Sequence, residues 1–241
     1  MKGFAKTDVG KAREMNQDYY CIPSSENDLQ LYILADGMGG YNGGEIASRL
    51  AAETTKNYIQ NNFDKIEHDK EAILKLVKDA MEYANMVVYE ESKKEQKLQG
   101  MGTTLDVCFI YNNKIYIGHV GDSRIYLIKK DIARKITKDH SYVQQLVEDK
   151  KITREEAEHH PKKNMLLKAL GCTSYVEPDI RARNLEKDDI IFMCSDGLTN
   201  MVEENKIYEV VRENKEKAPE ILVNLANNAG GYDNITVITI I

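Results

Sequence analysis

The sequence lacks several features that would assign it to a specialised class of protein. Its cysteines lie far apart and form no CxxC pair, which argues against a disulfide scaffold and against a structural zinc site. They are Cys21, Cys108, Cys172 and Cys194. Positive charge is not in excess, because 33 Lys and Arg stand against 39 Asp and Glu and the net charge is −6. Nucleic acids and anionic membranes are bound through clustered positive charge, so neither is expected as a partner.

Long apolar runs are also missing. The first residues, MKGFAKTDVGKARE, contain no apolar stretch of the signal-peptide kind. No run reaches the roughly 18 apolar residues that a membrane helix needs. The hydrophobic share of 42% and the charged share of 30% are those of an ordinary globular protein. Since no linker-like segment divides the chain, we expect one cytoplasmic domain over residues 1–241 and, by default, a monomer.

What the sequence does contain is a series of β-branched and aromatic runs typical of antiparallel strands. These runs cover residues 3–10, 18–23, 29–36, 103–113, 114–121, 123–130, 133–139, 189–196 and 233–241, with short turns at Asn112-Asn113 and Lys130-Asp131. Apolar residues at three- and four-residue steps predict helices over 44–62, 70–95, 203–213 and 218–228. The pattern predicts an α+β fold that is mostly antiparallel sheet with helices packed outside.

Residues 139–171 differ from the rest because they are polar and charged. Thr153 followed by Glu156 has the spacing of a capping box at the start of a helix. We interpret this segment as a short helical insertion between strands.

Aspartates stand where the apolar strands stop. LYILADG ends at Asp36, IYIGHVGDS at Asp122 and IIFMCSDG at Asp196, while Asp233 precedes the last strand and Asp18 begins another. Taken singly, each Asp-Gly pair is most simply a turn, because both residues tolerate positive φ. The turn interpretation is strongest at Asp122, which lies between two strands as in a hairpin loop, and weaker at Asp36 and Asp196, where helical patterns follow.

The recurrence of these acidic strand ends is more informative than any one of them. Carboxylates gathered without lysines repel one another unless a cation lies between them. Oxygen ligands suit Mg²⁺ or Mn²⁺, and no nearby Cys/His pairs favour zinc. Two such ions can activate water for attack on phosphorus. The spacing therefore suggests metal-assisted hydrolysis of a phosphoester.

Other motifs exclude competing chemistries. The glycine-rich stretch GMGGYNGG (37–44) is followed by Glu45 and is neither a Walker A loop nor a dinucleotide fingerprint, so we interpret it as a flexible connection. No GxSxG or HExxH motif is present. His119 lies within a strand, and we expect a structural role for it. Arg13, five residues before Asp18, could reach the same strand end and bind phosphate oxygens through paired hydrogen bonds, although most arginines are merely solvated.

Several motifs occur together in a recognisable order. They are RxxNQD (13–18), LADGMGG (34–40), GGEIAS (43–48), MGTTL (101–105), VGDSRIY (120–126), KDHS (138–141), HPKKNMLLKALG (160–171), CSDGLT (194–199) and GYDNITV (231–237). In this series, which spans nearly the whole chain, the sequence resembles the bacterial PP2C-type (PPM) metal-dependent serine/threonine protein phosphatases. The resemblance implies a central antiparallel β-sandwich flanked by helices on both sides, with a mobile flap at 139–171.

The resemblance also implies a set of site residues. Asp36, the Gly37 carbonyl, Asp196 and Asp233 would hold two Mn²⁺ or Mg²⁺ ions, with Asp18 in support. Asp122, together with Asp196, would contribute to a weaker third metal site, and Arg13 would bind the substrate phosphate. Catalysis would then depend on Arg13, Asp36, Asp196 and Asp233.

The implied reaction is hydrolysis of phosphoserine and phosphothreonine in proteins by a metal-bridging hydroxide, opposing a cognate bacterial serine/threonine kinase. One departure concerns Met38, which stands where eukaryotic relatives carry a histidine proposed as general acid. A catalytically weak phosphoprotein-binding module of the same fold is an alternative, but retention of Arg13 and of the carboxylates argues against it. A two-metal nuclease is disfavoured by the acidic balance.

Overall fold

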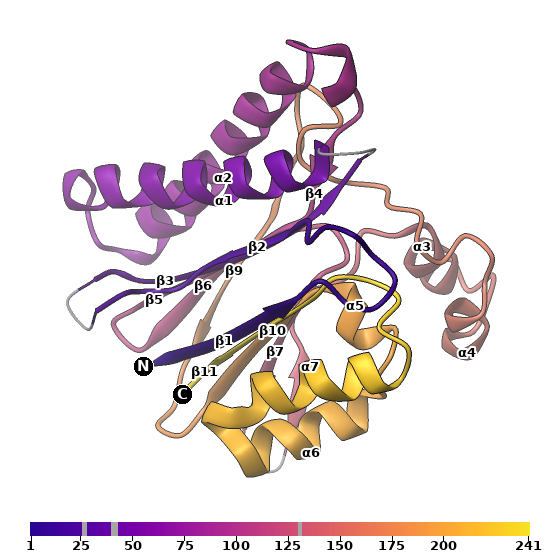
Figure 1. The fold of residues 1–241 in the computed structure, drawn as a ribbon. Helices are drawn as coiled ribbons and strands as arrows, with labels where there is room; N and C mark the ends of the chain where they lie inside the picture. The colour runs from indigo at the N-terminus through magenta and orange to yellow at the C-terminus, as the bar shows by residue number, and fades with distance from the viewer. Residues whose placement is uncertain (26–27, 40–42, 130–131) are drawn as a thin grey trace.

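The computed structural model of the chain describes residues 1–25, 28–39, 43–129 and 132–241. Its centre is two antiparallel sheets stacked face to face (Figure 1). One sheet has five strands in the order β1 (Gly3–Asp8), β11 (Ile235–Ile240), β10 (Ile190–Cys194), β7 (Arg124–Ile128) and β8 (Ala133–Lys135). The other has the order β2 (Asp18–Cys21), β3 (Gln30–Met38), β5 (Leu105–Tyr111), β6 (Lys114–Val120) and β9 (Asp179–Asn184), and β4 (Gly102–Thr103) pairs with β3.

Helices cover the outer face of each sheet (Figure 1). The helices α1 (Gly43–Asn62) and α2 (Lys70–Ser92) lie on the sheet that contains β3, and α6 (Glu204–Asn214) and α7 (Ala218–Asn228) lie on the sheet that contains β11. Single turns of 3-10 helix lie at Phe63–Lys65, Gln96–Leu98 and Lys215–Lys217. The expected sandwich flanked by helices on both sides is confirmed.

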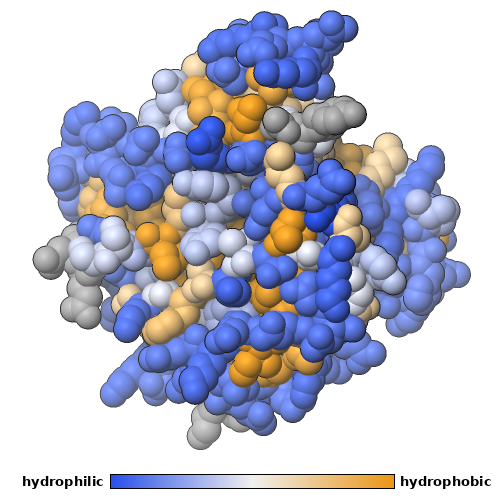
Figure 2. All heavy atoms as spheres, viewed as in Figure 1, coloured by the Kyte–Doolittle hydropathy of each residue, from blue (hydrophilic) through white to orange (hydrophobic). Residues whose placement is uncertain are grey.

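Strands buried on both faces explain the continuous apolar runs of the sequence. In β10, Ile191 and Met193 point into the layer between the two sheets, whereas Phe192 and Cys194 point toward α6 and α7. Successive side chains of a strand alternate between faces, so a strand with two buried faces has no polar alternation. Polar side chains instead cover most of the outer face shown in Figure 2, where apolar ones gather only in small patches. Among the described residues, no helix is long and apolar enough to cross a membrane.

Two short helices occupy the polar segment at 139–171. They are α3 (Tyr142–Glu148) and α4 (Arg154–Glu158), and Figure 1 shows them standing away from the sandwich. At α4 the Thr153 side chain accepts a hydrogen bond from Glu156 N at 3.2 Å, and the Glu156 side chain accepts one from Thr153 N at 2.7 Å. The predicted capping box and the predicted helical insertion are confirmed.

Two predicted turns have different outcomes, and one strand was not predicted. Asn112 and Asn113 form the predicted turn, with φ of 46° and 56° between β5 and β6. The turn predicted at Lys130-Asp131 lies outside the described residues. Strand β9 was not predicted, because its sequence, DIRARN, is rich in charge and half of its side chains are exposed. It lies at a sheet edge, where one flank needs no partner strand.

Candidate active site

The aspartates at the strand ends come together at one end of the sandwich. Asp18 and Asp36 are directly opposite each other in the pairing of β2 with β3. Asp196 follows β10 and Asp233 precedes β11, two strands that are themselves paired. Asp122 follows β6. We call Asp18, Asp36, Asp122, Asp196 and Asp233 the acidic cluster.

The chain crosses from one sheet to the other at Asp122. Strand β6 belongs to the sheet that contains β3, and β7 belongs to the opposite sheet. The interpretation of Gly121-Asp122 as a simple hairpin loop is therefore wrong. The physical reason for the glycine is the crossing itself, since Gly121 has a φ of +118°. This crossing brings a carboxylate from the end of a strand in one sheet to the ends of strands in the other.

The glycines beside Asp36 and Asp196 are required for close packing. Gly37 lies within β3 and Gly197 within a short helix, α5 (Asp196–Thr199), and neither has a left-handed φ. A Cβ atom on Gly37 would lie 2.1 Å from the carbonyl oxygen of Gly44, and one on Gly197 would lie 2.0 Å from that of Asn234. The turn interpretation is thus wrong at both positions.

The members of the acidic cluster are close enough to perturb one another's ionisation. Burial, followed by the negative charges of the other four, raises the pKa of Asp36 well above its usual range. Burial with the charges of Asp196 and Asp233 raises the pKa of Asp18 to about 7. Burial with neighbouring carboxylates also raises the pKa of Asp122 to about 8 and that of Asp196 to about 6. When ionised, the carboxylates of the cluster therefore repel one another, and their negative charge is costly unless a cation binds.

A divalent cation fits this set of donors. The donors are hard carboxylate oxygens, and Asp18 Oδ1 is buried without a hydrogen-bond partner. In the parts of the chain that the structure describes, no three His, Cys, Asp or Glu side chains already converge on one point as ligands. Ions bound here would therefore have to complete their shells with water, as Mg²⁺ commonly does.

Arg13 lies at the rim of the acidic cluster. Its Nη2 atom donates a hydrogen bond to Asp233 Oδ2 at 2.9 Å, and half of its side chain is exposed. The predicted phosphate ligand is thus brought to the predicted metal ligands, with a guanidinium edge still open to solvent. A doubly charged phosphate could be held there by paired hydrogen bonds.

A buried amide that sequence reasoning missed holds the segment carrying Arg13. The Asn234 side chain donates to Val9 O and Met15 O, both at 2.9 Å, and accepts from Gln17 N at 2.8 Å. Asn234 is next to Asp233 in the chain and buried. It therefore fixes Arg13 and Asp233 relative to each other. An amide that bonds only to backbone leaves no charge or periodic pattern in a sequence.

Three buried hydroxyl groups were also missed, because single Ser and Thr residues leave no charge or periodic pattern in the sequence. Thr104 Oγ1 accepts from Asp36 N at 2.9 Å and shares a hydrogen bond with Ser123 Oγ at 2.8 Å. It thereby ties the Asp36 strand to the residue after Asp122. Ser195 donates to Asp18 Oδ2 at 2.8 Å and accepts from Thr236 N at 2.9 Å. It thereby connects β2, which carries Asp18, to β10 and β11 of the other sheet.

The histidines nearest to the cluster have structural roles. His119 is buried, with Nδ1 2.5 Å from Asp106 Oδ1 and Nε2 2.9 Å from Lys138 O. His140 accepts from Gly121 N through Nδ1 at 3.1 Å, and its ring lies 4.8 Å from that of His119. The structural role expected for His119 is confirmed. Of the glycine-rich stretch, residues 40–42 lie outside the described part, and Met38 ends β3.

Comparisons with known proteins identify relatives of the chain in sequence and in fold. The family described as Protein phosphatase 2C matches residues 10–226. The chain is 38% identical over 234 residues to the Streptococcus pneumoniae protein named Protein phosphatase PhpP, covering 96% of this chain and 93% of that protein. The solved structure of serine/threonine phosphatase Stp1 from Staphylococcus aureus superposes with a TM-score of 0.91 at 31% identity, covering 99% and 93% of the two chains.

A further solved structure is relevant to the metal. The catalytic domain of the serine/threonine protein phosphatase PstP, in complex with two manganese ions, superposes with a TM-score of 0.86 at 32% identity. The match covers 99% of this chain and 96% of that one.

Proposed function

Because the chain belongs to the protein phosphatase 2C family, we propose that it is a bacterial serine/threonine protein phosphatase whose reaction takes place at the acidic cluster. The observation that carries the proposal is the convergence of Asp18, Asp36, Asp122, Asp196 and Asp233 from both sheets onto one centre, where their ionised forms repel one another. Burying carboxylates together is costly, and a bound cation removes the cost. The family resemblance and the donor chemistry point to the same place.

We propose that the cluster holds divalent ions, either Mn²⁺ or Mg²⁺. Asp36, the Gly37 carbonyl, Asp196 and Asp233 would hold two ions, with Asp18 supporting them through its free Oδ1. Asp122 would share a weaker third site with Asp196. When bound, such ions supply an activated water and neutralise charge on the phosphoryl group. The PstP structure with two manganese ions supports this metal class.

Arg13 binds and orients the substrate phosphate in this proposal. Its guanidinium is held beside Asp233 by a hydrogen bond of 2.9 Å, and the exposed remainder can donate to phosphoryl oxygens. Asn234 keeps the Arg13 segment in place through its three backbone contacts. The phosphate is thereby positioned without any side chain becoming covalently attached to it.

The proton for the departing hydroxyl comes from solvent rather than from a histidine. Met38 cannot donate a proton, and both ring nitrogens of His119 are already engaged within the fold. Ser195 is buried and bonded to Asp18, so it is not available as a nucleophile. The chain itself contributes the carboxylates that would bind the cations and the arginine that orients the phosphate.

The biological setting belongs to the same proposal. Phosphorylated proteins are the substrates. The phosphatase reverses phosphorylation by a cognate serine/threonine kinase and also dephosphorylates that kinase. The segment at 139–171, which carries α3 and α4, would act as a flap beside the site in a single domain of residues 1–241. We propose action as a monomer in the cytoplasm.

The test is hydrolysis of a phosphothreonine peptide. We expect turnover with Mn²⁺ and none with EDTA. Arg13→Ala should raise KM about 10-fold or more, because a hydrogen bond between charged groups is worth about 1.5–3 kcal/mol, while exposed Arg183→Ala on the far sheet edge should leave KM unchanged. Full turnover in EDTA, or an unchanged KM in Arg13→Ala, would contradict the proposal. Folded, Mn²⁺-loaded protein without turnover would instead favour a phosphoprotein-binding module.

A further inference from the structure

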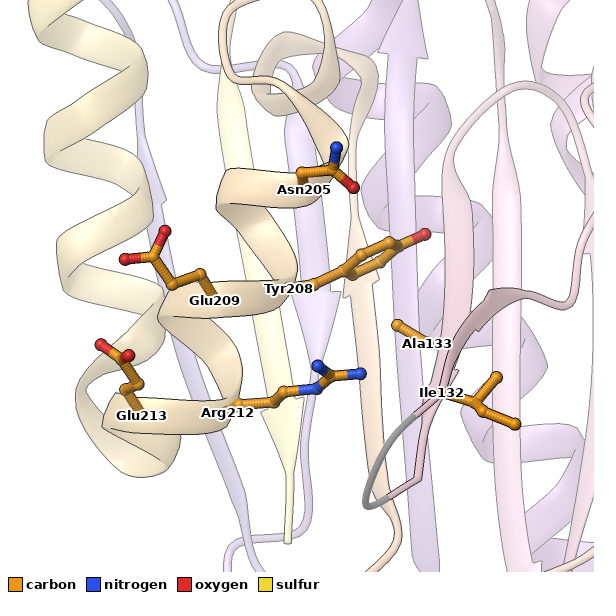
Figure 3. Close-up of a pocket in the computed structure, with 7 residues that line it drawn as sticks. All are labelled: Ile132, Ala133, Asn205, Tyr208, Glu209, Arg212 and Glu213. Atoms are coloured by element: carbon orange, nitrogen blue, oxygen red, sulfur yellow. The ribbon is translucent and has the colours of Figure 1, made fainter.

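A groove lies between α6 and the edge strand β8, away from the acidic cluster. It has a volume of about 580 Å³, and its walls are formed by Ile132, Ala133, Asn205, Tyr208, Glu209, Arg212 and Glu213 (Figure 3). Asp122 and Ile132 lie beyond opposite ends of β7. A molecule in the groove would therefore leave the acidic cluster accessible.

The strand side of the groove presents backbone groups that no neighbouring strand uses. Lys129 and Ile132 exchange backbone hydrogen bonds, and Ile136 N donates to Ile125 O at 2.8 Å. In an antiparallel pair, bonded positions alternate, so Ala133 and Lys135 direct their N–H and C=O groups away from β7. Within the described residues nothing pairs with that edge of β8. The two positions are about 7 Å apart along the strand and can receive one added strand.

The helix side of the groove carries an unpaired cation. Figure 3 shows Tyr208 and Arg212 extending from α6 toward Ala133 and Ile132, while Glu209 and Glu213 point along the other side of the helix. Among the residues that the structure describes, Arg212 makes no ion pair or hydrogen bond, and Glu209 is already paired with Lys206 at 2.9 Å. Tyr208 is held in place by an edge contact with buried Tyr126, their ring centres 5.6 Å apart.

We propose that this groove binds an extended acidic segment of a partner protein, which adds a strand to β8 and places a carboxylate against Arg212. Backbone pairing would supply affinity, and alternate side chains would supply selectivity, as in other cases of strand addition. Side chains of the added strand on the helix face would meet Arg212 and Tyr208, so Asp or Glu at alternate positions is the matching pattern. Arg212 is a single positive charge facing the strand, and one guanidinium balances one carboxylate but not the two charges of a phosphate.

The probe for this site is a fluorescein-labelled peptide in which Asp alternates with Val. Binding to the full chain is followed by fluorescence anisotropy, and a second peptide with Lys in place of Asp tests charge. We expect saturable binding of the Asp peptide and at least about 10-fold weaker binding of the Lys peptide, since a charge-assisted hydrogen bond is worth about 1.5–3 kcal/mol. In EDTA and in the Arg13→Ala background, where hydrolysis and phosphate binding at the acidic cluster are removed, a phosphothreonine version of the probe should bind no more tightly than the Asp peptide.

Two variants separate the side-chain and backbone contributions. Arg212→Ala should weaken binding about 10-fold or more, whereas Arg183→Ala, an exposed arginine of β9, should have no effect. Ala133→Pro removes only an outward N–H, so the fold should survive while binding is lost. Phosphopeptide hydrolysis should stay at the wild-type rate in both groove variants, which reports that they are folded and keeps the groove separate from the proposed reaction.

Several outcomes would overturn the docking proposal while leaving the phosphatase proposal untouched. They are no binding of the Asp peptide at about 1 mM, where specific contacts are still measurable, equal binding of the Lys peptide, or wild-type binding by Arg212→Ala or Ala133→Pro. Tighter binding of the phosphothreonine peptide that depends on Arg212 would replace the carboxylate by a phosphate as the ligand.

Discussion

Two neighbouring groups of buried carboxylates differ in whether a cationic or histidine side chain lies beside each carboxylate. Asp106 and Asp139, which we call the paired carboxylates, each have a cationic or hydrogen-bonding partner. Asp106 contacts His119 at 2.5 Å, and Asp139 contacts Arg124 at 2.8 Å and Lys135 at 3.0 Å. The acidic cluster, by contrast, contains five carboxylates and a single direct ion pair among the described residues, Arg13 with Asp233.

The difference shows which ionised carboxylates favour folding and which oppose it. A buried charge is costly unless it is paired. At Asp139 burial acts to raise the pKa, but Arg124 and Lys135 outweigh it, so the ionised form favours folding. At Asp106 burial outweighs the contact with His119 and the pKa is raised. Members of the acidic cluster raise one another's pKa, which means that their ionised forms oppose folding. We attribute the acidic cluster to the cation that it would bind, since a cation removes the repulsion among its carboxylates.

The largest expected effect comes from Asp36→Asn, which removes one charge from the acidic cluster at nearly constant shape. Metal ions contribute several kcal/mol to charge stabilisation in a transition state, so kcat/KM for a phosphothreonine peptide should fall about 10³-fold or more. In EDTA the same variant should be more stable than wild type by about 1 kcal/mol, because repulsion is relieved. Hydrolysis assays and urea unfolding measure the two effects.

Opposite signs of the two effects are the essential outcome of that experiment. Exposed Asp149→Asn, which removes a surface partner of Lys151, is the matched control and should change neither quantity appreciably. Loss of both activity and metal-free stability in Asp36→Asn would place Asp36 with the paired carboxylates instead.

The next effect is on stability and comes from Asp139→Ala. This change leaves Arg124 and Lys135, which are about one-quarter exposed, without their shared carboxylate. Breaking a buried pair costs about 3–5 kcal/mol, and partial exposure of the cations lowers our expectation to about 2–3 kcal/mol. Urea unfolding should show this loss, whereas Asp149→Ala should cost less than about 0.5 kcal/mol. Equal losses in the two variants would remove the distinction between the carboxylate groups.

The fold was largely predictable because burial on both faces of a strand leaves a strong sequence signal. Continuous apolar runs such as IIFMC in β10 and ITVITI in β11 identify central strands, and the three- and four-residue steps of α1 and α2 identify their covering helices. β9 gave no such signal because its side chains are charged and it is paired on one flank only. Its position follows from pairing with β6, a contact between residues far apart in the chain.

The site was predictable only where charge made it visible. Aspartates at strand ends can be found without a structure, but their common meeting point depends on the crossing at Gly121-Asp122, which looks like a hairpin in the sequence. Thr104, Ser195 and Asn234 connect the parts of the site through hydrogen bonds made by uncharged side chains. Such bonds depend on which groups tertiary packing brings near, and sequence patterns do not encode that.

The smallest expected effect concerns pH and uses the same Asp139→Ala variant. Burial acts to raise the pKa of Asp139, but the charges and hydrogen bonds of Arg124 and Lys135 outweigh burial, so the pKa is lowered from its usual value. A carboxyl whose pKa is lower in the folded state contributes stability above its unfolded pKa of about 3.9, and this contribution is lost as pH falls through the folded-state value.

The stability difference between wild type and Asp139→Ala should therefore shrink as the solution is acidified below about pH 5. Urea unfolding of both proteins in EDTA at a series of pH values measures this difference. Comparison with Asp149→Ala corrects for changes in stability on acidification that do not depend on Asp139. The difference contains the titration of Asp139 and the changes that loss of its charge causes at His119 and Asp122. A difference that grows on acidification would mean that Asp139 is destabilised by its surroundings, as members of the acidic cluster are, and that its contacts with Arg124 and Lys135 do not outweigh the cost of burying it.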